Sequence, residues 1–90
     1  MIKHFNITVS GRVQGVYYRA STKDKADELG IKGFVRNEPN GNVYVEAEGT
    51  QDQLDRLITW CKQGPPHAVV SSVDVKEGGV VSFEKFEIRR

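Results

Sequence analysis

The order in which two hydrophobic periodicities follow one another constrains the fold of this chain more than any other feature. Residues 3–10 alternate apolar and polar, with Phe5, Ile7 and Val9 on one side, as in a half-buried strand. Apolar residues then recur at helical spacing, once after residue 17 and again after residue 50. The period of two returns in four later segments, at residues 31–37, 43–48, about 68–76 and 83–88.

The second helical segment has the clearer boundaries. Thr50 suits an N-cap position, and Gln53 follows three residues later, as in a capping box. Its apolar residues recur at i, i+3, i+4 and i+7, namely Leu54, Leu57, Ile58 and Cys61. Gly64-Pro65-Pro66 ends it. In the first helical segment, one face carries Tyr18, Thr22, Ala26 and Leu29, and the helix is expected to end at Gly30.

These elements predict the order β-α-β-β-α-β with a short terminal strand. That order is typical of the ferredoxin-like α+β fold, a βαββαβ two-layer sandwich with an antiparallel sheet and two helices on one face. Pro39 and Asn40-Gly41 predict a turn that makes a hairpin of residues 31–37 and 43–48. With 90 residues, we expect a single domain over 1–90.

Composition excludes several classes of partner. The formal net charge is +1, so the chain as a whole does not attract nucleic acid or an anionic membrane surface. No apolar run approaches the ~20 residues needed to span a bilayer. The first residues lack the apolar core of a signal peptide. We therefore expect a cytoplasmic protein without nucleic-acid or membrane partners.

The candidate site is the stretch Gly11-Arg12-Val13-Gln14-Gly15-Val16-Tyr17-Tyr18-Arg19, which links the first strand to the first helix. It contains two glycines, no acidic residue, and an arginine near each end. Backbone N–H groups in such a turn form a concave anion site that the helix dipole strengthens. An arginine at its rim can hold the anion through two parallel charged hydrogen bonds. The alternative is an ordinary strand-to-helix turn with a solvated arginine.

Other reactive side chains lack a motif. His4 and His67 have no catalytic partners in the sequence, and we expect both to be solvated residues at strand ends. His4, His67 and Cys61 do not have metal-ligand spacing, so no metal is expected. Cys61 is the only cysteine and lies on the apolar face of the second helix, which predicts a buried thiol rather than a nucleophile.

Asn37 ends the second predicted strand. In the expected fold this strand flanks the third, which is adjacent to the first, so Asn37 could stand near the Gly11–Arg19 stretch. Its amide can hold a water through both donor and acceptor. The alternative is that Asn37 only initiates the turn that begins at Glu38-Pro39.

Two stretches resemble the signatures of the acylphosphatase family, in the family's order. They are GRVQGVYYR, Gly11 to Arg19, and GFVRNEPNGNVYVEAEG, Gly33 to Gly49. The resemblance implies a ferredoxin-like fold and metal-independent hydrolysis of the carboxyl–phosphate bond of acyl phosphates, with no cofactor. Water would attack phosphorus, and inorganic phosphate would be a product. For a domain this small we expect a monomer.

By motif position, the resemblance implies two catalytic residues. Arg19 would bind the phosphoryl group, and Asn37 would position the attacking water. The phosphate would also be held by backbone N–H groups, those of Gly15, Val16, Tyr17, Tyr18 and Arg19.

Two other functions are compatible with the same fold. Small βαββαβ domains bind RNA through aromatic residues on the open sheet face, but here Tyr44 is flanked by Glu46 and Glu48, which repel phosphate. A regulatory module that binds a small ligand without catalysis is the other alternative. The presence of both Arg19 and Asn37 favours an enzyme.

Overall fold

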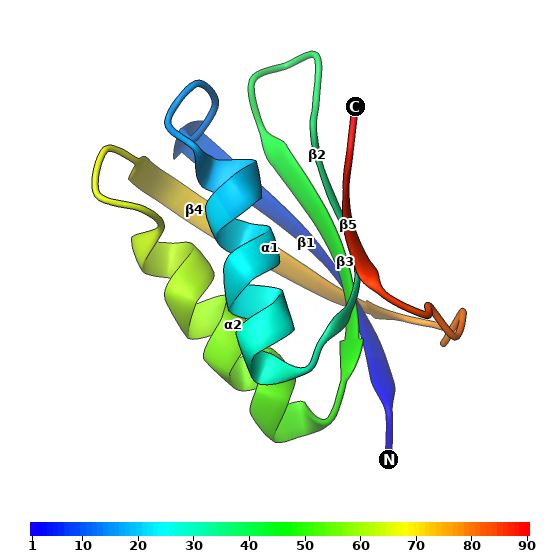
Figure 1. The fold of residues 1–90 in the computed structure, drawn as a ribbon. Coiled ribbons are helices and arrows are strands. Elements are labelled where there is room, and N and C mark those ends of the chain that lie inside the picture. The colour runs from blue at the N-terminus through cyan, green and yellow to red at the C-terminus, as the bar shows by residue number, and fades with distance from the viewer.

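The computed structural model describes residues 1–90, and its elements follow the predicted order (Figure 1). They are β1 (Lys3–Arg12), α1 (Tyr18–Leu29), β2 (Lys32–Asn37), β3 (Val43–Gly49), α2 (Gln51–Gln63), β4 (Val69–Gly78) and β5 (Phe86–Arg89). The predicted ferredoxin-like α+β fold is therefore confirmed.

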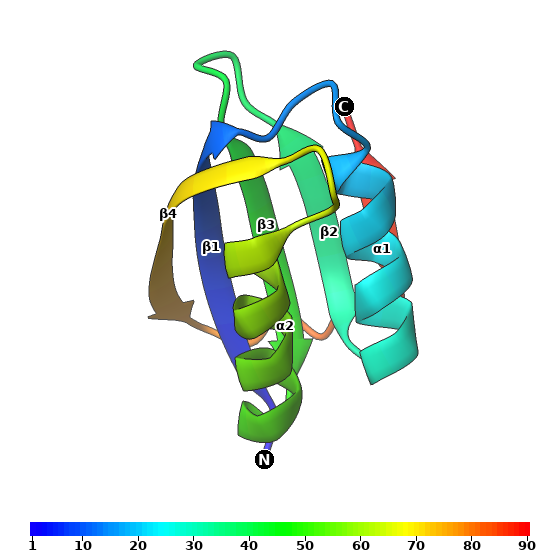
Figure 2. The ribbon, with the colours of Figure 1, turned by 90° about the vertical axis from the view of Figure 1, so that its left-hand side faces the viewer.

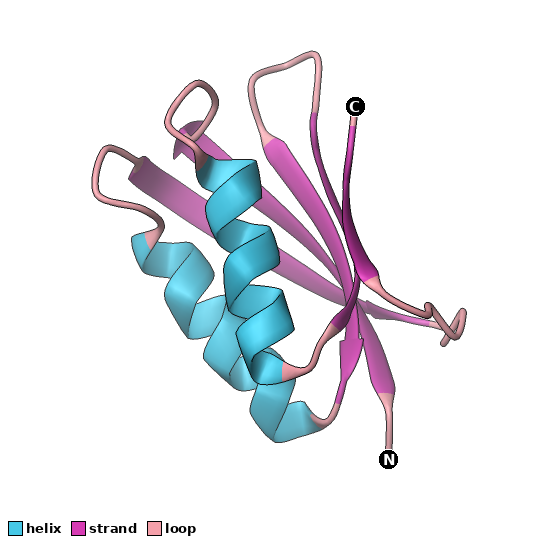
Figure 3. Cartoon of the chain, viewed as in Figure 1, coloured by secondary structure: helices cyan, strands magenta, loops and turns pink.

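The helices and the sheet form two layers. Figure 2 shows α1 and α2 on the same face of the sheet, and Figure 3 separates the helical layer from the strands. The strand order is β4-β1-β3-β2-β5. The predicted hairpin of β2 and β3 is present, with Val35 opposite Val45, and β1 lies beside β3 with Ile7 also opposite Val45. The ends of β1 and β2 are thus brought to the same region.

The last strand differs from the expected antiparallel sheet. β4, β1, β3 and β2 pair antiparallel, but β5 pairs parallel with β2, with Val35 opposite Ile88. The chain reverses after β4 and crosses the sheet to its opposite edge instead of pairing back on β4. Residues 79–85, here called the crossing segment, make that passage. The sheet is therefore mixed, and β5 is shorter than the predicted 83–88.

Strand β1 is longer than expected because it continues past an irregularity. Its register with β4 shifts between Ser10 and Gly11, and pairing then continues to Arg12. Gly11 has φ 123°, and a Cβ there would collide with the carbonyl oxygen of Val69. Only glycine fits such a close approach of two backbones. The shift sets the direction in which the chain enters the loop before α1.

The core lies between the sheet and the helices. Its fully buried side chains come from every layer and include Ile7, Val9, Ile31, Val35, Val43, Val45, Leu54, Leu57 and Cys61. The helix stripes and strand faces predicted from periodicity supply most of this set. The core fixes both helices relative to the strand ends.

The expectation of a solvated His4 is wrong. His4 is 3% exposed, and its ring stacks on Phe83 of the crossing segment at 5.7 Å. Nδ1 lies 2.7 Å from Glu48 Oε2, and Nε2 lies 2.9 Å from Asn6 Oδ1 and 3.0 Å from Glu46 Oε1. The crossing segment covers this end of the sheet, which local sequence does not reveal. His67 is exposed, as expected.

Candidate active site

The loop between β1 and α1 lies at the end of the sheet where β2 also ends. Figure 1 shows this loop, the β2–β3 turn and the C-terminus at the same end of the molecule. Within the loop, Gly15 has φ 73° and Tyr17 has φ 63°, both in the left-handed region. A non-glycine residue there costs on the order of 1–3 kcal/mol, and such strain is common at binding sites. The loop is thus held in a curled conformation at the start of α1.

The first N–H groups of α1 have no hydrogen-bond acceptor within the protein. Tyr17 occupies the N-cap position with no side-chain cap, and the first turn contains no acidic residue. None of the N–H groups of residues 15–19 donates to another backbone group. Unpaired N–H groups at a helix start, together with the helix dipole, favour an anion. The five residues predicted to hold phosphate therefore present free donors.

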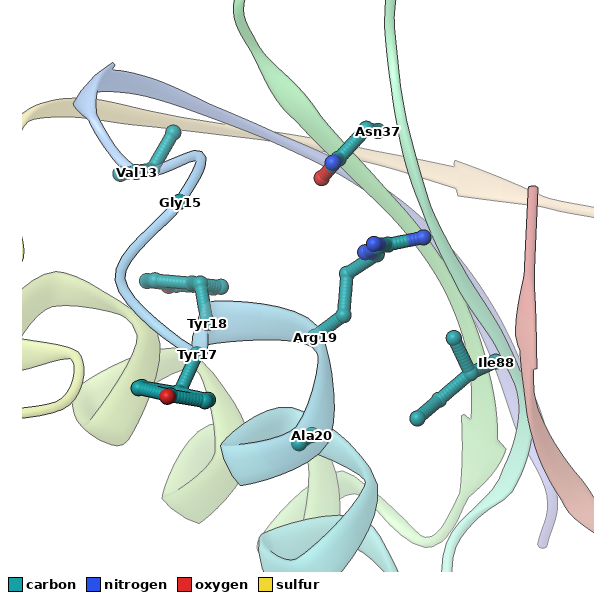
Figure 4. A pocket seen from close by; sticks show the side chains of 8 residues that line it. All are labelled: Val13, Gly15, Tyr17, Tyr18, Arg19, Ala20, Asn37 and Ile88. Carbon is teal, nitrogen blue, oxygen red and sulfur yellow. The ribbon is translucent and has the colours of Figure 1, made fainter.

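Arg19 lies in the first turn of α1, and its side chain points into the pocket beside the loop (Figure 4). The side chain is half-buried. Its Nη1 donates a long hydrogen bond of 3.4 Å to the carbonyl oxygen of Arg89, and no carboxylate lies within ion-pair distance. The guanidinium keeps most of its donors available for an anion.

Asn37 lies at the end of β2, on the face of the sheet that α1 covers. Its side chain is half-buried, and Figure 4 shows its amide pointing into the space between the β1–α1 loop and Arg19. The pocket between them has a volume of about 400 Å³. Its lining residues are Val13, Gly15, Tyr17, Tyr18, Arg19, Ala20, Asn37 and Ile88. Of the predicted site residues, only Val16 is outside this lining, and its side chain packs against the core.

Tyr18 anchors the start of α1 to α2. Its side chain is 2% exposed, its hydroxyl donates to the carbonyl oxygen of Cys61 at 2.7 Å, and its ring lies 5.4 Å from that of Trp60. Burial raises the pKa of Tyr18 well above its usual range. The phenol therefore stays protonated and directed away from the pocket, which leaves the backbone of Tyr18 as its available group.

A comparison with known families agrees with this geometry. A sequence model of the family described as acylphosphatase matches residues 5–88. The chain belongs to the acylphosphatase family.

Individual acylphosphatases resemble the chain over nearly its whole length. The acylphosphatase of Acaryochloris marina is 56% identical over 82 residues, covering 91% of this chain and 88% of the relative. That of Methylococcus capsulatus is 48% identical over 90 residues, covering 99% and 98%. The structure of an acylphosphatase from Coxiella burnetii superposes with a TM-score of 0.95 at 40% identity, covering 98% of this chain and 93% of that one.

One residue that braces the loop beside this pocket was missed by sequence reasoning. Gln14 Nε2 donates to the carbonyl oxygens of Glu38 at 2.8 Å and Asn42 at 2.9 Å. These bonds tie the β1–α1 loop to the turn that begins directly after Asn37. The only available signal was an amide side chain between two glycines of the loop.

The remaining candidate residues do not line the pocket beside the β1–α1 loop. Cys61 is fully buried, and burial raises the pKa of its thiol to about 12, so it is not a ready nucleophile. No three residues among His, Cys, Asp and Glu are grouped to hold a metal ion. Neither helix has the length and hydropathy needed to cross a bilayer.

Proposed function

We propose that this protein hydrolyses acyl phosphates in the pocket between the β1–α1 loop and Asn37. As a member of the acylphosphatase family, it is a hydrolase that cleaves the carboxyl–phosphate bond to give a carboxylate and inorganic phosphate. The observation that supports the location best is the convergence of free N–H groups, an unpaired Arg19 and the Asn37 amide on one pocket.

The phosphoryl group binds in the curl of the loop. The N–H groups of residues 15–19 donate to its oxygens, and Arg19 pairs with it through its guanidinium. A charged hydrogen bond of this kind contributes about 1.5–3 kcal/mol. Phosphoryl transfer depends mainly on positioning and on charge stabilisation. Arg19 supplies the positive charge, so no metal ion is required.

Asn37 orients the attacking water. Its amide offers an acceptor for a water proton and a donor for the water oxygen. An amide has no useful pKa, so Asn37 acts by positioning and not as a base. The pocket lining contains no histidine and no carboxylate. A non-bridging oxygen of the substrate phosphate therefore accepts the proton of the water.

The leaving group needs little assistance. The bond from phosphorus to the bridging oxygen breaks as the water oxygen bonds to phosphorus, and the electron pair leaves on a carboxylate. A carboxylate is a stable anion at neutral pH, so no general acid has to protonate it. This chemistry accounts for a site that contains no general acid.

The pocket also bears on the domain organisation and the oligomeric state of the protein. We propose that residues 1–90 act as a single-domain monomer in the cytoplasm, with the small acyl phosphate as substrate. Every residue given a role in this reaction, except Val16, lines one pocket of a single chain.

Hydrolysis in water enriched in ¹⁸O tests the proposal. Benzoyl phosphate is incubated with the protein and excess EDTA, and both products are analysed by mass spectrometry. We expect turnover with the label only in inorganic phosphate, because water attacks phosphorus. Label in benzoate would show attack on the carbonyl carbon and would contradict the mechanism. Loss of turnover with EDTA would contradict metal independence.

A further inference from the structure

The pocket has an apolar rim that the chemistry proposed above does not use. Two large apolar residues line its mouth, Tyr17 at 80% exposed and Ile88 at 41%. Ala20 also lines the pocket. Large exposed apolar side chains gathered at one cavity are characteristic of a binding surface.

These two residues come from opposite ends of the chain. Tyr17 stands at the start of α1 in the left-handed conformation, φ 63°, where a glycine or an asparagine would fit with less strain. Ile88 reaches the pocket because β5 pairs parallel with β2, two residues before Asn37. The loop conformation and the parallel strand thus bring both side chains to the same pocket.

The geometry of phosphoryl transfer places the acyl group of the substrate at this rim. In a phosphoryl transfer the attacking and leaving oxygens lie roughly in line across phosphorus. Figure 4 shows Asn37 on one side of the pocket and Tyr17 and Ala20 on the other, with Arg19 between them. Water held at Asn37 therefore expels the carboxylate toward the side where Tyr17 and Ala20 lie.

We propose that Tyr17 and Ile88 form a subsite for the acyl group of the substrate. This inference rests on the function proposed above. All acyl phosphates share the phosphoryl end, so only the acyl group can distinguish them. The rim carries no carboxylate, and Arg19 is the single cation of the lining. The subsite therefore selects acyl groups with an aromatic or bulky hydrocarbon part over the small acetyl group.

The test measures selectivity as the ratio of kcat/KM for benzoyl phosphate to kcat/KM for acetyl phosphate. Comparing this ratio between variants cancels the intrinsic reactivity of the two substrates. Tyr17→Asn removes the ring with a residue that tolerates φ > 0, and we expect the ratio to fall about 5–20-fold. Ile88→Thr keeps a β-branched side chain on β5, and we expect a fall of about threefold. Tyr17→Phe retains the ratio.

A matched control uses an exposed apolar residue outside the pocket. Val69 is 61% exposed on β4, and Val69→Thr leaves the ratio unchanged. If Tyr17→Asn and Ile88→Thr hydrolyse both substrates at the wild-type ratio, the subsite is disproved while the hydrolase function stands. If the wild-type protein hydrolyses neither substrate, the proposed function fails first. Should Tyr17→Asn not fold by circular dichroism, Ile88→Thr alone decides the question.

Discussion

Helices α1 and α2 lie side by side on the sheet, but their N-termini are completed in different ways. At α2, Thr50 Oγ1 accepts from the Gln53 N–H at 3.3 Å, and Gln53 Oε1 accepts from the Thr50 N–H at 2.8 Å. Asp52 adds a negative charge in the first turn. At α1, the cap is a strained Tyr17 with no side-chain acceptor, and the first turn has no acidic residue.

The two helix N-termini serve different purposes: that of α2 adds stability, and that of α1 is left available for a ligand. A capping box satisfies the first N–H groups within the chain, so α2 is stabilised by its own sequence. Helix α1 leaves the same groups without partners and places Arg19 beside them, so the completing acceptor has to come from outside. The first helix lacks this local stabilisation, and its uncapped N-terminus is the anion site proposed above.

The largest expected effect is at the arginine of the open helix end. We expect Arg19→Ala to lower kcat/KM for benzoyl phosphate about 10³-fold or more, because it removes a preorganised donor to the charged phosphoryl group. Inhibition by inorganic phosphate should be lost as well. Arg12→Ala is the matched control, since it removes the same charge from the exposed other end of the loop. Unchanged phosphate affinity in Arg19→Ala would exclude Arg19 from the site.

The second effect separates binding from turnover at the same helix end. We expect Asn37→Ala to lower kcat about 10²–10³-fold, because the water loses its orientation. Phosphate inhibition should stay within about threefold of wild type, since the loop and Arg19 are intact. Asn40→Ala, in the turn after β2, controls for local disturbance. A collapse of phosphate affinity with a surviving rate would reverse the two assigned roles.

A third variant gives the open helix end the acid that it lacks. Ala20 occupies the N3 position of α1, which corresponds to Gln53 in α2. We expect Ala20→Glu to weaken phosphate inhibition about tenfold, because a carboxylate in the first turn repels the anion and uses the same dipole. The neutral variant Ala20→Gln controls for side-chain size. Equal inhibition constants for the two variants would argue against an anion site at this helix end.

The smallest effect is at the closed helix end. We expect Thr50→Ala to lower the free energy of unfolding by about 1 kcal/mol, because the capping box is lost. Urea denaturation measures this change, and kcat and KM measured in parallel should match wild type. A loss of activity without a loss of stability would show that the two helix ends are not separate in role.

Much of the fold could be predicted because it follows from local periodicity. The alternation in β1 and the stripe from Leu54 to Cys61 each specify one buried face, and two layers are the simplest way to bury all of them. The parallel pairing of β5 could not be predicted. Two open edges were available to the last strand, and the choice depends on how the crossing segment packs against β1 and β3.

The candidate site was predictable for a similar reason and to a similar limit. The order β1-β3-β2 placed Asn37 near the loop, and the structure brings it to the same pocket as Arg19. Their catalytic roles stay predictions. Gln14 was missed because its carbonyl partners, at Glu38 and Asn42, are 24 and 28 residues away. Long-range bonds of this kind leave no local pattern.

The buried His4 makes the stability of the fold depend on proton binding. Burial lowers the pKa of His4, but hydrogen bonds to Glu48 and Asn6 and the charge of Glu46 outweigh it, so the pKa is raised. Both ring nitrogens face acceptor oxygens, which the doubly protonated ring satisfies. The stability that His4 contributes is complete below its ordinary pKa of 6.5 and is lost as pH rises through the raised value.

Glu48 sets the acid limit of the same cluster. Burial raises the pKa of Glu48. Hydrogen bonds from His4 and from the N–H groups of Val81 and Phe83 act in the opposite direction and are stronger together, so the pKa is lowered overall. Its contribution to stability is present above the ordinary pKa of 4.5 and is lost as pH falls through the lowered value.

In urea titrations we expect the wild-type protein to be more stable at pH 5.5 than at pH 8. We expect His4→Asn to reduce that difference in stability, and His67→Gln to leave it unchanged. The packing of the crossing segment on His4 and Glu48 is therefore most stable in a mildly acidic medium. The same holds for β5, the strand that follows this segment and carries Ile88.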